Sequence, residues 1–255
     1  MRHTTLESAL EQDRLIVLAG LIGLSVLAWA YLMWDAGTVS CLAMPRMGTW
    51  GARELWLTFA MWAIMMVAMM VPSAAPMVLT FALVNRKRQE QARPFVPTSV
   101  FLAGYLIVWT LFSAAAALAQ WGLHKTALLS SAMVLTNPAA GIAVLLAVGV
   151  FQFTPLKRAC LVHCRTPLTF LMTEWREGAR GALIMGLRHG AFCLGCCWFL
   201  MGLLFVAGVM NLLWVAAISL LVLAEKAAPA GHRVSWAAGL LLIGWSAWMT
   251  VGALR

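Results

Sequence analysis

Cys193, Cys196 and Cys197 stand within five residues of one strongly apolar stretch, and His189 precedes the first of them by four positions. A helix turns by about 100° per residue, so all four side chains would share one face. Thiolates and imidazoles are ligands that soft or borderline transition metals accept. We therefore predict that this face contributes ligands to a metal site.

That face cannot complete a metal site alone. His189 and Cys197 lie eight residues apart, about 12 Å along a helix axis, whereas bonds to a metal are about 2.0–2.3 Å long. A pair one turn apart, such as Cys193 with Cys197, could bind one ion together with ligands from elsewhere. Cys160 and Cys164 have the same spacing in the more polar stretch that comes before. We expect the two groups of thiols to converge in space.

A second source of soft ligands is the methionine-rich stretch earlier in the chain. Met61, Met65 and Met69 would form one row on a helix, and Met66 and Met70 a second row. Thioethers suit Cu(I), although methionine also packs well as a flexible apolar side chain. Taken together, the predicted metal ligands are Cys160, Cys164, Cys193, Cys196, Cys197, His163, His189, Met65 and Met69.

The ligand types narrow the choice of metal. Thiols in apolar surroundings favour Cu(I), with Zn(II) as the other candidate. Calcium and magnesium require oxygen ligands, and the chain has only nine aspartates and glutamates, few of them in the apolar stretches. An iron–sulfur cluster needs about four thiolates, which the count of cysteines allows. The alternative is a purely structural role, in which the cysteines pack as small apolar residues without binding a metal.

Composition indicates an integral membrane protein. Of the 255 residues 63% are hydrophobic and 11% are charged, against about 45–50% and about 25% in soluble proteins. The net charge of +9 would suggest nucleic-acid binding in a soluble protein. Here the basic residues lie between apolar runs, so membrane topology explains them, and we expect no nucleic-acid partner.

The apolar runs predict an all-α bundle of about seven transmembrane helices, because lipid leaves no other way to satisfy the backbone. The sixth run has only thirteen residues, so the count falls to six if it does not cross. We expect one transmembrane domain over residues 1–255, with a short cytoplasmic segment at 1–14. The predicted spans are Leu15–Trp34, Leu55–Val84, Pro97–Leu123, Pro138–Leu156, His189–Gly208, Leu212–Ala224 and Val234–Leu254.

The distribution of lysine and arginine orients this bundle. With seven spans, thirteen basic residues fall on the side of the amino terminus and four on the other, with Arg188 at a helix start. Cytoplasmic loops carry the excess of basic residues, so the amino terminus should be cytoplasmic, in a multi-pass protein of the bacterial inner membrane. The loop Lys157–Gly181, with its cysteine pair, then lies on the cytoplasmic side, where we expect the thiols to meet.

Three smaller features carry structural expectations. Gly186 and Gly190 have the spacing that allows close packing of membrane helices. Pro72 and Pro76 should break or kink their helix and leave carbonyl groups in need of partners. Glu225 and Lys226 end a predicted span, where they would extend to the interface; the alternative is a pair on a proton or ion path.

Three stretches resemble a bacterial family of uncharacterised proteins described as predicted metal-binding integral membrane proteins. They are "MWAIMMVAMMVPSAAPM", "FTPLKRACLVHCRTP" and "HGAFCLGCCWFLM". The resemblance covers most of the chain, roughly from Leu55 to Leu254. It implies a membrane location and metal binding, but no established reaction. The positions that match its motifs are Cys160, Cys164, His189, Cys193, Cys196 and Cys197.

The leading hypothesis is therefore a membrane protein that binds Cu(I), or Zn(II), at cytoplasm-facing thiolates for transport or for delivery to a metallochaperone or metalloenzyme. We expect a binding protein rather than an enzyme. The first alternative is a thiol–disulfide oxidoreductase coupled to quinone, although a reducing cytoplasm disfavours disulfides. The second is a metal-free assembly subunit. The sequence contains no nucleotide-binding motif and does not indicate an oligomeric state.

Overall fold

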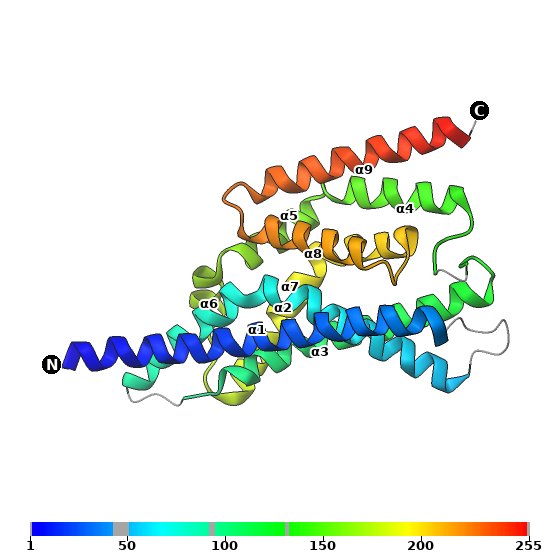
Figure 1. Ribbon diagram of the computed structural model, residues 1–255. Helices are drawn as coiled ribbons and strands as arrows, with labels where there is room; N and C mark the ends of the chain where they lie inside the picture. The colour runs from blue at the N-terminus through cyan, green and yellow to red at the C-terminus, as the bar shows by residue number, and fades with distance from the viewer. Residues whose placement is uncertain (1, 43–50, 92–94, 131–132, 254–255) are drawn as a thin grey trace.

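The computed structural model describes residues 2–42, 51–91, 95–130 and 133–253 (Figure 1). These residues form helices joined by turns, with one isolated β-bridge, so the predicted all-α class is confirmed. The helices are α1 Arg2–Leu42, α2 Ala52–Glu90, α3 Thr98–Lys125, α4 Pro138–Phe151, α5 Pro155–Arg165, α6 Pro167–Glu174, α7 Gly178–Ala207, α8 Leu212–Ala227 and α9 Gly231–Ala253.

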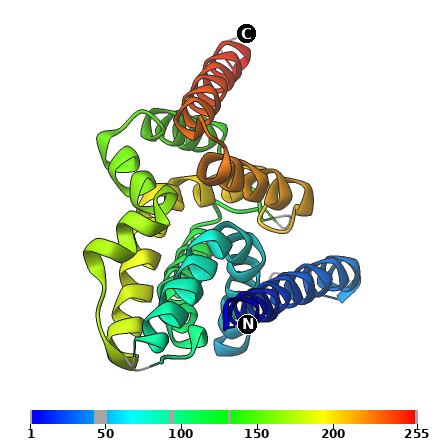
Figure 2. The same ribbon diagram turned by 90° about the vertical axis from the view of Figure 1, so that its left-hand side faces the viewer.

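Most of the long helices lie roughly parallel and alternate in direction, and α7 crosses them obliquely (Figures 1 and 2). α1, α3, α7 and α9 begin at the end of the molecule that holds the amino terminus, and α2, α4 and α8 begin at the other end. The short helices α5 and α6 lie at the amino-terminal end. Six of the seven predicted spans therefore each coincide with one long helix or with α8, whereas Pro138–Leu156 covers α4 and the start of α5.

Length separates these helices into two groups. Five of them, α1, α2, α3, α7 and α9, are long and apolar enough to cross a membrane by themselves. α4 and α5 reach that length only as a pair, bent by 61° at a short break. α8 has 16 residues, fewer than the roughly 20 that span a bilayer. By length the structure thus supports five spans, or six with the bent pair, rather than seven.

The break between α4 and α5 differs from the single span Pro138–Leu156 that we expected. α4 ends at Phe151, and α5 starts at Pro155. A proline has no N–H and cannot continue the helical ladder, but it is well suited to the first position of a new helix. The Thr154 hydroxyl caps that helix by accepting a bond of 3.3 Å from the Lys157 N–H.

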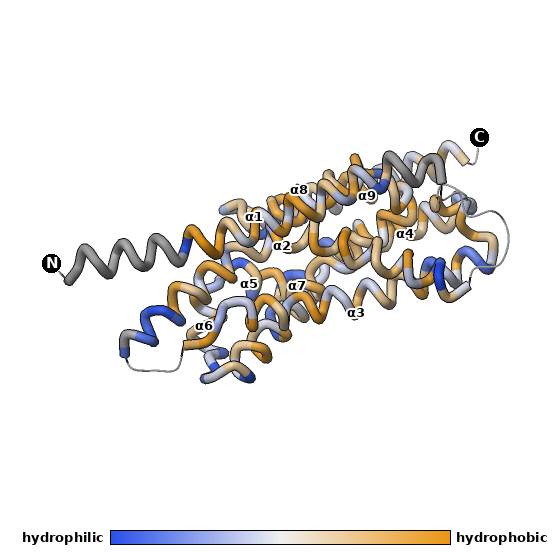
Figure 3. The backbone as a smooth tube through the Cα atoms, turned by 60° about the horizontal axis from the view of Figure 1, so that its bottom comes forward, coloured by the Kyte–Doolittle hydropathy of each residue, from blue (hydrophilic) through white to orange (hydrophobic). Residues whose placement is uncertain are grey.

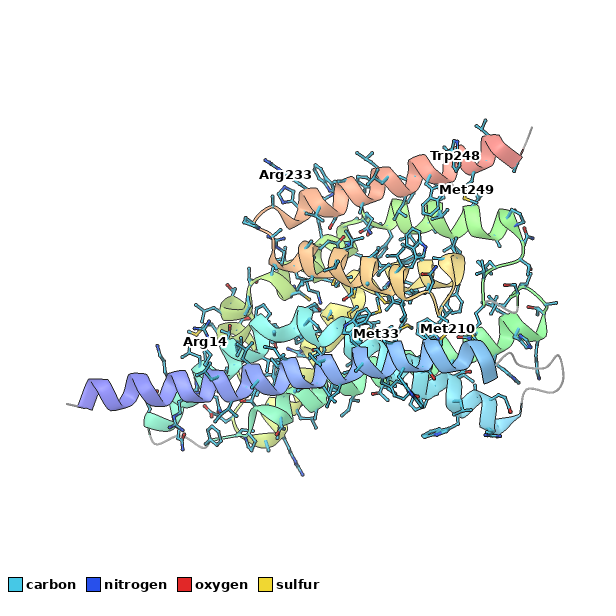
Figure 4. The ribbon with its side chains drawn as sticks, viewed as in Figure 1. Arg14, Met33, Met210, Arg233, Trp248 and Met249 are labelled. Atoms are coloured by element: carbon cyan, nitrogen blue, oxygen red, sulfur yellow. The ribbon has the colours of Figure 1, made fainter. Side chains whose placement is uncertain are left out.

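Charge is distributed as the topology predicted. Arg14 and Arg233 lie toward the same end of the bundle (Figure 4), and apolar residues cover most of each long helix between the two ends (Figure 3). The opposite end has Arg53 and Lys125 near helix termini. The direction of the helices places further basic residues toward the Arg14 end: Arg86, Lys87 and Arg88 at the end of α2, Arg180 at the start of α7 and Lys226 at the end of α8. Arg46, Arg93 and Arg255 lie outside the described residues.

The bundle is tightest between α3 and α7, as the glycine spacing predicted. A Cβ atom at Gly186 would stand 2.1 Å from the Phe101 carbonyl oxygen, and one at Gly104 would stand 2.4 Å from the Leu183 oxygen. Gly190 faces the Val108 side chain in the same way, at 2.9 Å. Both backbones can approach this closely only because these positions lack side chains.

α2 forms the centre of the bundle and packs against α1, α3, α6 and α8. It does not end at Pro72 or Pro76, but continues through both. Because Pro72 has no N–H, the Ala68 carbonyl loses its helical donor. The indole N–H of Trp29 donates to that oxygen at 3.1 Å. For the carbonyl freed by Pro72, the expected outside partner is therefore supplied by α1.

We predict that Gly186→Ala destabilises the folded protein by about 1–3 kcal/mol, because the added methyl group would overlap backbone that cannot rotate away. The matched control is Gly202→Ala on the same helix, where a Cβ would be 4.0 Å from its nearest neighbour, Val144. Thermal unfolding of both variants in detergent measures the difference. Equal stability of the two variants would contradict the packing described for α3 and α7.

Candidate metal centre

The face of α7 that carries the thiols points into the bundle. His189, Cys193, Cys196 and Cys197 are each at most 1% exposed. α7 packs against α3, α4, α5 and α8, so this face is enclosed by protein rather than turned to lipid. The shared face expected from the spacing is thus buried, and its surroundings decide what the thiols can do.

Cys193 is the most connected of the thiols. The Lys226 ammonium donates to its sulfur at 2.9 Å, and the Tyr105 hydroxyl lies 3.1 Å from the same sulfur. Lys226 also donates to the Ser73 hydroxyl at 2.9 Å, and Tyr105 donates to the Met70 carbonyl oxygen at 3.1 Å. Four helices therefore meet around one sulfur atom. A buried ammonium beside a thiol stabilises the thiolate, which is the form that binds metals.

The next two cysteines of α7 bond back to the helix. The Cys196 and Cys197 thiols donate to the Cys193 carbonyl oxygen, at 3.0 Å and 2.8 Å. The Cys197 sulfur also lies 4.0 Å from the thioether sulfur of Met70. A thiol and a thioether from two different helices are thus neighbours in the core.

α5 brings the second cysteine pair to the same place. Cys164 is buried and lies close enough to Cys193 and Cys196 to interact with them electrostatically. Cys160 is partly exposed, and its sulfur lies 2.7 Å from the point where Gly195 would carry a Cβ atom. These five cysteines are free thiols, and the two groups converge in space as we expected. Whether they bind a metal stays a prediction.

The two predicted histidine ligands have different positions. His189 is buried with its ring stacked near Tyr105, at 5.5 Å between centroids, and within the described part of the chain its Nδ1 has no hydrogen-bond partner. His163 is exposed and stacks in parallel on Phe192, at 4.1 Å. Its Nδ1 lies 2.8 Å from the Ala159 carbonyl oxygen. His163 therefore lies on the surface beside the cluster rather than within it.

The methionine next to the thiols belongs to the row Met66 and Met70, which contains none of the predicted ligands. Met65 and Met69 are buried in the core, but the thioether described next to Cys197 belongs to Met70. The two rows differ by one residue, or about 100° around the helix. Which row faces the thiols depends on how α2 is rotated against α7, and the spacing alone does not determine that rotation.

Glu225 and Lys226 lie inside the bundle. We expected both to extend to the membrane interface, but their exposed fractions are only 1% and 8%. Together with Tyr105 and Ser73, Lys226 forms the polar surroundings of Cys193. The available signal was a charged pair attached to an otherwise apolar helix, since ionisable groups inside a bundle are usually paired and functional.

A buried ion pair fixes α5 onto α8. The Lys157 ammonium donates to both carboxylate oxygens of Glu225 at 2.8 Å, and each side chain is 1% exposed. Arg165, at the other end of α5, donates to the carbonyl oxygens of Glu225 and Ala228, both at 2.6 Å. α5 is therefore held at two points, with Cys160 and Cys164 between them.

Geometry limits how an ion could bind here. Within the residues that the structure describes, no group of three or more His, Cys, Asp or Glu side chains stands ready to hold a metal ion. Pairs of sulfur atoms are closer to what is needed. Two sulfur ligands at about 2.3 Å each can lie no more than about 4.6 Å apart. The 4.0 Å between the Cys197 and Met70 sulfurs satisfies this limit.

A model of a known protein family covers most of the chain. A family model described as "PpoB2: Copper chaperone" matches residues 59–249. The chain belongs to this family. The match to the copper chaperone family runs from within α2 to within α9 and includes every predicted ligand. It also confirms the metal-related family that the motifs suggested. No curated protein and no solved structure matches the chain.

We predict that Lys157→Met alone destabilises the protein by about 3–5 kcal/mol, because it leaves the Glu225 carboxylate buried without a partner. The double variant Lys157→Met with Glu225→Leu should recover most of that loss, since it removes both charges. Unfolding in denaturant for the wild type, both single variants and the double variant completes the cycle. Additive losses in the double variant would contradict the direct pairing.

Proposed function

We propose that this chain binds Cu(I) as cargo at the buried sulfur cluster and hands it on to a protein that needs it. The observation that carries the proposal is the 4.0 Å contact between the Cys197 thiol and the Met70 thioether, beside the Lys226-bound Cys193. Membership of a family described as copper chaperones supports the same ion.

The chemistry of the donors favours Cu(I) over Zn(II). Thiolate and thioether together are a soft donor set, which suits Cu(I). Zinc prefers four ligands drawn from thiolate, imidazole and carboxylate, and a methionine sulfur is not among them. Cys193 and Cys197 on α7, Cys164 on α5 and Met70 on α2 are the ligands that we assign. The Cys197 sulfur, whose S–H group now donates to the Cys193 carbonyl oxygen, would lose its proton and turn toward the ion.

Charge balance explains the lysine at this site. One Cu(I) ion with the thiolates of Cys193 and Cys197 carries a single negative charge, because the Met70 thioether is neutral and Cys164 binds as the protonated thiol. Burying an uncompensated charge costs several kcal/mol. The Lys226 ammonium, 2.9 Å from the Cys193 sulfur, would cancel that charge. The copper-loaded site would then be neutral as a whole, which suits an interior enclosed by apolar helices.

The arrangement fits transfer better than permanent storage. The ligands come from three helices, and one of those helices, α5, is a short segment bent away from α4. Soft ligands can be exchanged one at a time between neighbouring sulfur atoms, so the ion need not leave the site in one step. We infer that the chain passes Cu(I) between a metallochaperone and a metalloenzyme, and that it does not itself catalyse a reaction.

We predict that the purified protein binds Cu(I), and that changing Cys193, Cys196 and Cys197 together to serine abolishes the binding. Met70→Leu should weaken Cu(I) binding by roughly tenfold or more, the order of effect found when support of a metal site is lost. Met61→Leu, a buried position on the same helix, is the matched control. Element analysis measures the bound copper, and competition with a Cu(I) chelator measures the affinity of each variant. Full copper content in the triple serine variant would remove the proposal.

The location that we propose is the bacterial inner membrane, with the thiol-bearing end at the cytoplasm. Five helices long and apolar enough to cross a membrane support membrane association. The excess of basic residues at the end with α5 and α6 supports the orientation.

We predict that two exposed positions, one at each end of the bundle, are accessible to a labelling reagent from opposite sides of the membrane. In a background without native cysteines, Lys125→Cys should react with an impermeant maleimide in intact spheroplasts, and Arg180→Cys only after the membrane is opened. The reason is that the end with more basic residues stays in the cytoplasm. Labelling of Arg180→Cys in intact cells would reverse the orientation.

A second candidate function rests on Cys164 and Cys193, two buried thiols close enough to interact electrostatically. Two thiols in reach of each other, one beside an ammonium, are also what thiol–disulfide exchange requires. In that case the chain would be an oxidoreductase coupled to quinone. A disulfide between these two cysteines in cells, together with turnover that depends on quinone, would favour this candidate over copper delivery.

A further inference from the structure

The thiol cluster is closed to solvent except at one residue. Among the cysteines that the structure describes, Cys164, Cys193, Cys196 and Cys197 are buried, and Cys160 alone is partly exposed. Any donor or acceptor of Cu(I) outside the protein therefore meets Cys160 first. This matters if, as proposed above, the buried sulfur atoms hold copper, and the inference that follows rests on that proposed function.

The position of Cys160 suits contact with both the outside and the cluster. Its sulfur lies over Gly195 of α7, at a place where any side chain would collide with it. Cys160 is also close enough to Cys196 for the two thiols to interact electrostatically. The absence of a side chain at position 195 thus lets the α5 thiol approach the α7 thiols.

One turn along α5, His163 lies over Phe192 in the matching position of α7. Its Nδ1 is engaged with the Ala159 carbonyl oxygen at 2.8 Å. Histidines that bind metals commonly fix one ring nitrogen on a carbonyl in this way, which leaves Nε2 to bind the ion. Cys160 and His163 are three residues apart on one helix, so their side chains are neighbours.

We propose that Cys160, assisted by His163, is the exchange station through which Cu(I) enters and leaves the buried cluster. Cu(I) arrives bound to a thiolate of the donor. The Cys160 sulfur forms a bond to copper, the copper–donor sulfur bond breaks, and the Cys160 proton passes to the departing donor thiolate. The same exchange then moves copper from Cys160 to Cys196 and on toward Cys193. Copper stays Cu(I) throughout, so no oxidant or reductant is needed.

The charge around this station indicates the class of donor. Arg158, two residues before Cys160, is exposed, and Arg233 is exposed at the end of the bundle where α9 begins. The α6–α7 segment also carries two carboxylates, Glu174 and Glu177. Their charges are already balanced by ion pairs with Arg188 and Arg88, respectively. Cationic surfaces accelerate association with anions. The donor that fits is an anionic Cu(I)–thiolate complex, either a small thiol peptide or an acidic protein.

The test separates the rate of copper transfer from the amount bound. Purified full-length protein in detergent is loaded from Cu(I)–glutathione, which is anionic, and loading is followed by ultraviolet absorption from copper–thiolate bonds. Cys160→Ser should bind the same amount of copper at equilibrium but load more slowly by roughly tenfold or more. His163→Phe, which keeps the stack on Phe192, should slow loading to a smaller extent.

A backbone variant tests the same route without touching a ligand. Gly195→Ala should displace the Cys160 sulfur and slow loading, whereas Gly202→Ala on the same helix has room for its methyl group and should load as the wild type does. Loading from Cu(I)–glutathione should slow as salt rises, by roughly tenfold or more. Loading from Cu(I)–cysteamine, which carries positive charge, should be slower at low salt and should not slow further when salt is added. An acidic carrier protein as donor would show a steeper salt dependence than glutathione.

The outcomes distinguish this inference from the proposed function. Unchanged loading rates in both Cys160→Ser and Gly195→Ala, with normal copper content, would overturn the exchange station and leave the buried site intact. Loss of bound copper at equilibrium in Cys160→Ser would make Cys160 a permanent ligand and also overturn it. A wild-type protein that binds no Cu(I) at all would overturn both proposals together.

Discussion

The contact of the Lys226 ammonium with the Cys193 sulfur is the constraint on which the centre of the bundle depends. An ammonium removed from water must find acceptors, or its burial costs several kcal/mol. Here the acceptors are the Cys193 sulfur and the Ser73 hydroxyl, and Tyr105 joins the same group. α2, α3, α7 and α8 are consequently tied at one point, and the glycine contacts of α3 with α7 allow that point to be compact.

The turn between α4 and α5 has a comparable role at the edge of the site. Without the break before Pro155, the chain would continue along α4 past the thiols of α7. Instead α5 bends by 61° and lies against α7, held by Lys157 and Arg165. A proline, a capping threonine and one ion pair are thus enough to place two cysteines beside three others that lie about thirty residues further along the chain.

Several features of this molecule follow from the sequence by simple periodicity. The shared face of Cys193, Cys196 and Cys197 depends only on the angle per residue, and the close approach at Gly186 only on the absence of a side chain. The all-α class and the distribution of basic residues follow from composition. These predictions concern one helix at a time, so local rules were sufficient.

The features that could not be predicted depend on how helices meet. Met70 rather than Met65 or Met69 lies beside Cys197, because the rotation of α2 is set by its neighbours on all sides. Lys226 points inward rather than to the interface because its ammonium group has hydrogen-bond acceptors on two other helices, Ser73 on α2 and Cys193 on α7. The length of α8 matters as well: a helix of 16 residues leaves its last turn within the bundle. None of these follows from spacing along the chain.

The hydrogen bond from the Trp29 indole N–H to the Ala68 carbonyl oxygen gives α1 a structural role in the bundle. α1 lies outside the part of the chain that matches the family, which starts at residue 59. Yet a proline in the family region left that oxygen without a donor, and α1 supplies one. A shortened protein lacking α1 would leave this peptide oxygen in the methionine stretch without a donor. The first helix therefore completes the hydrogen bonding of the sulfur-rich interior.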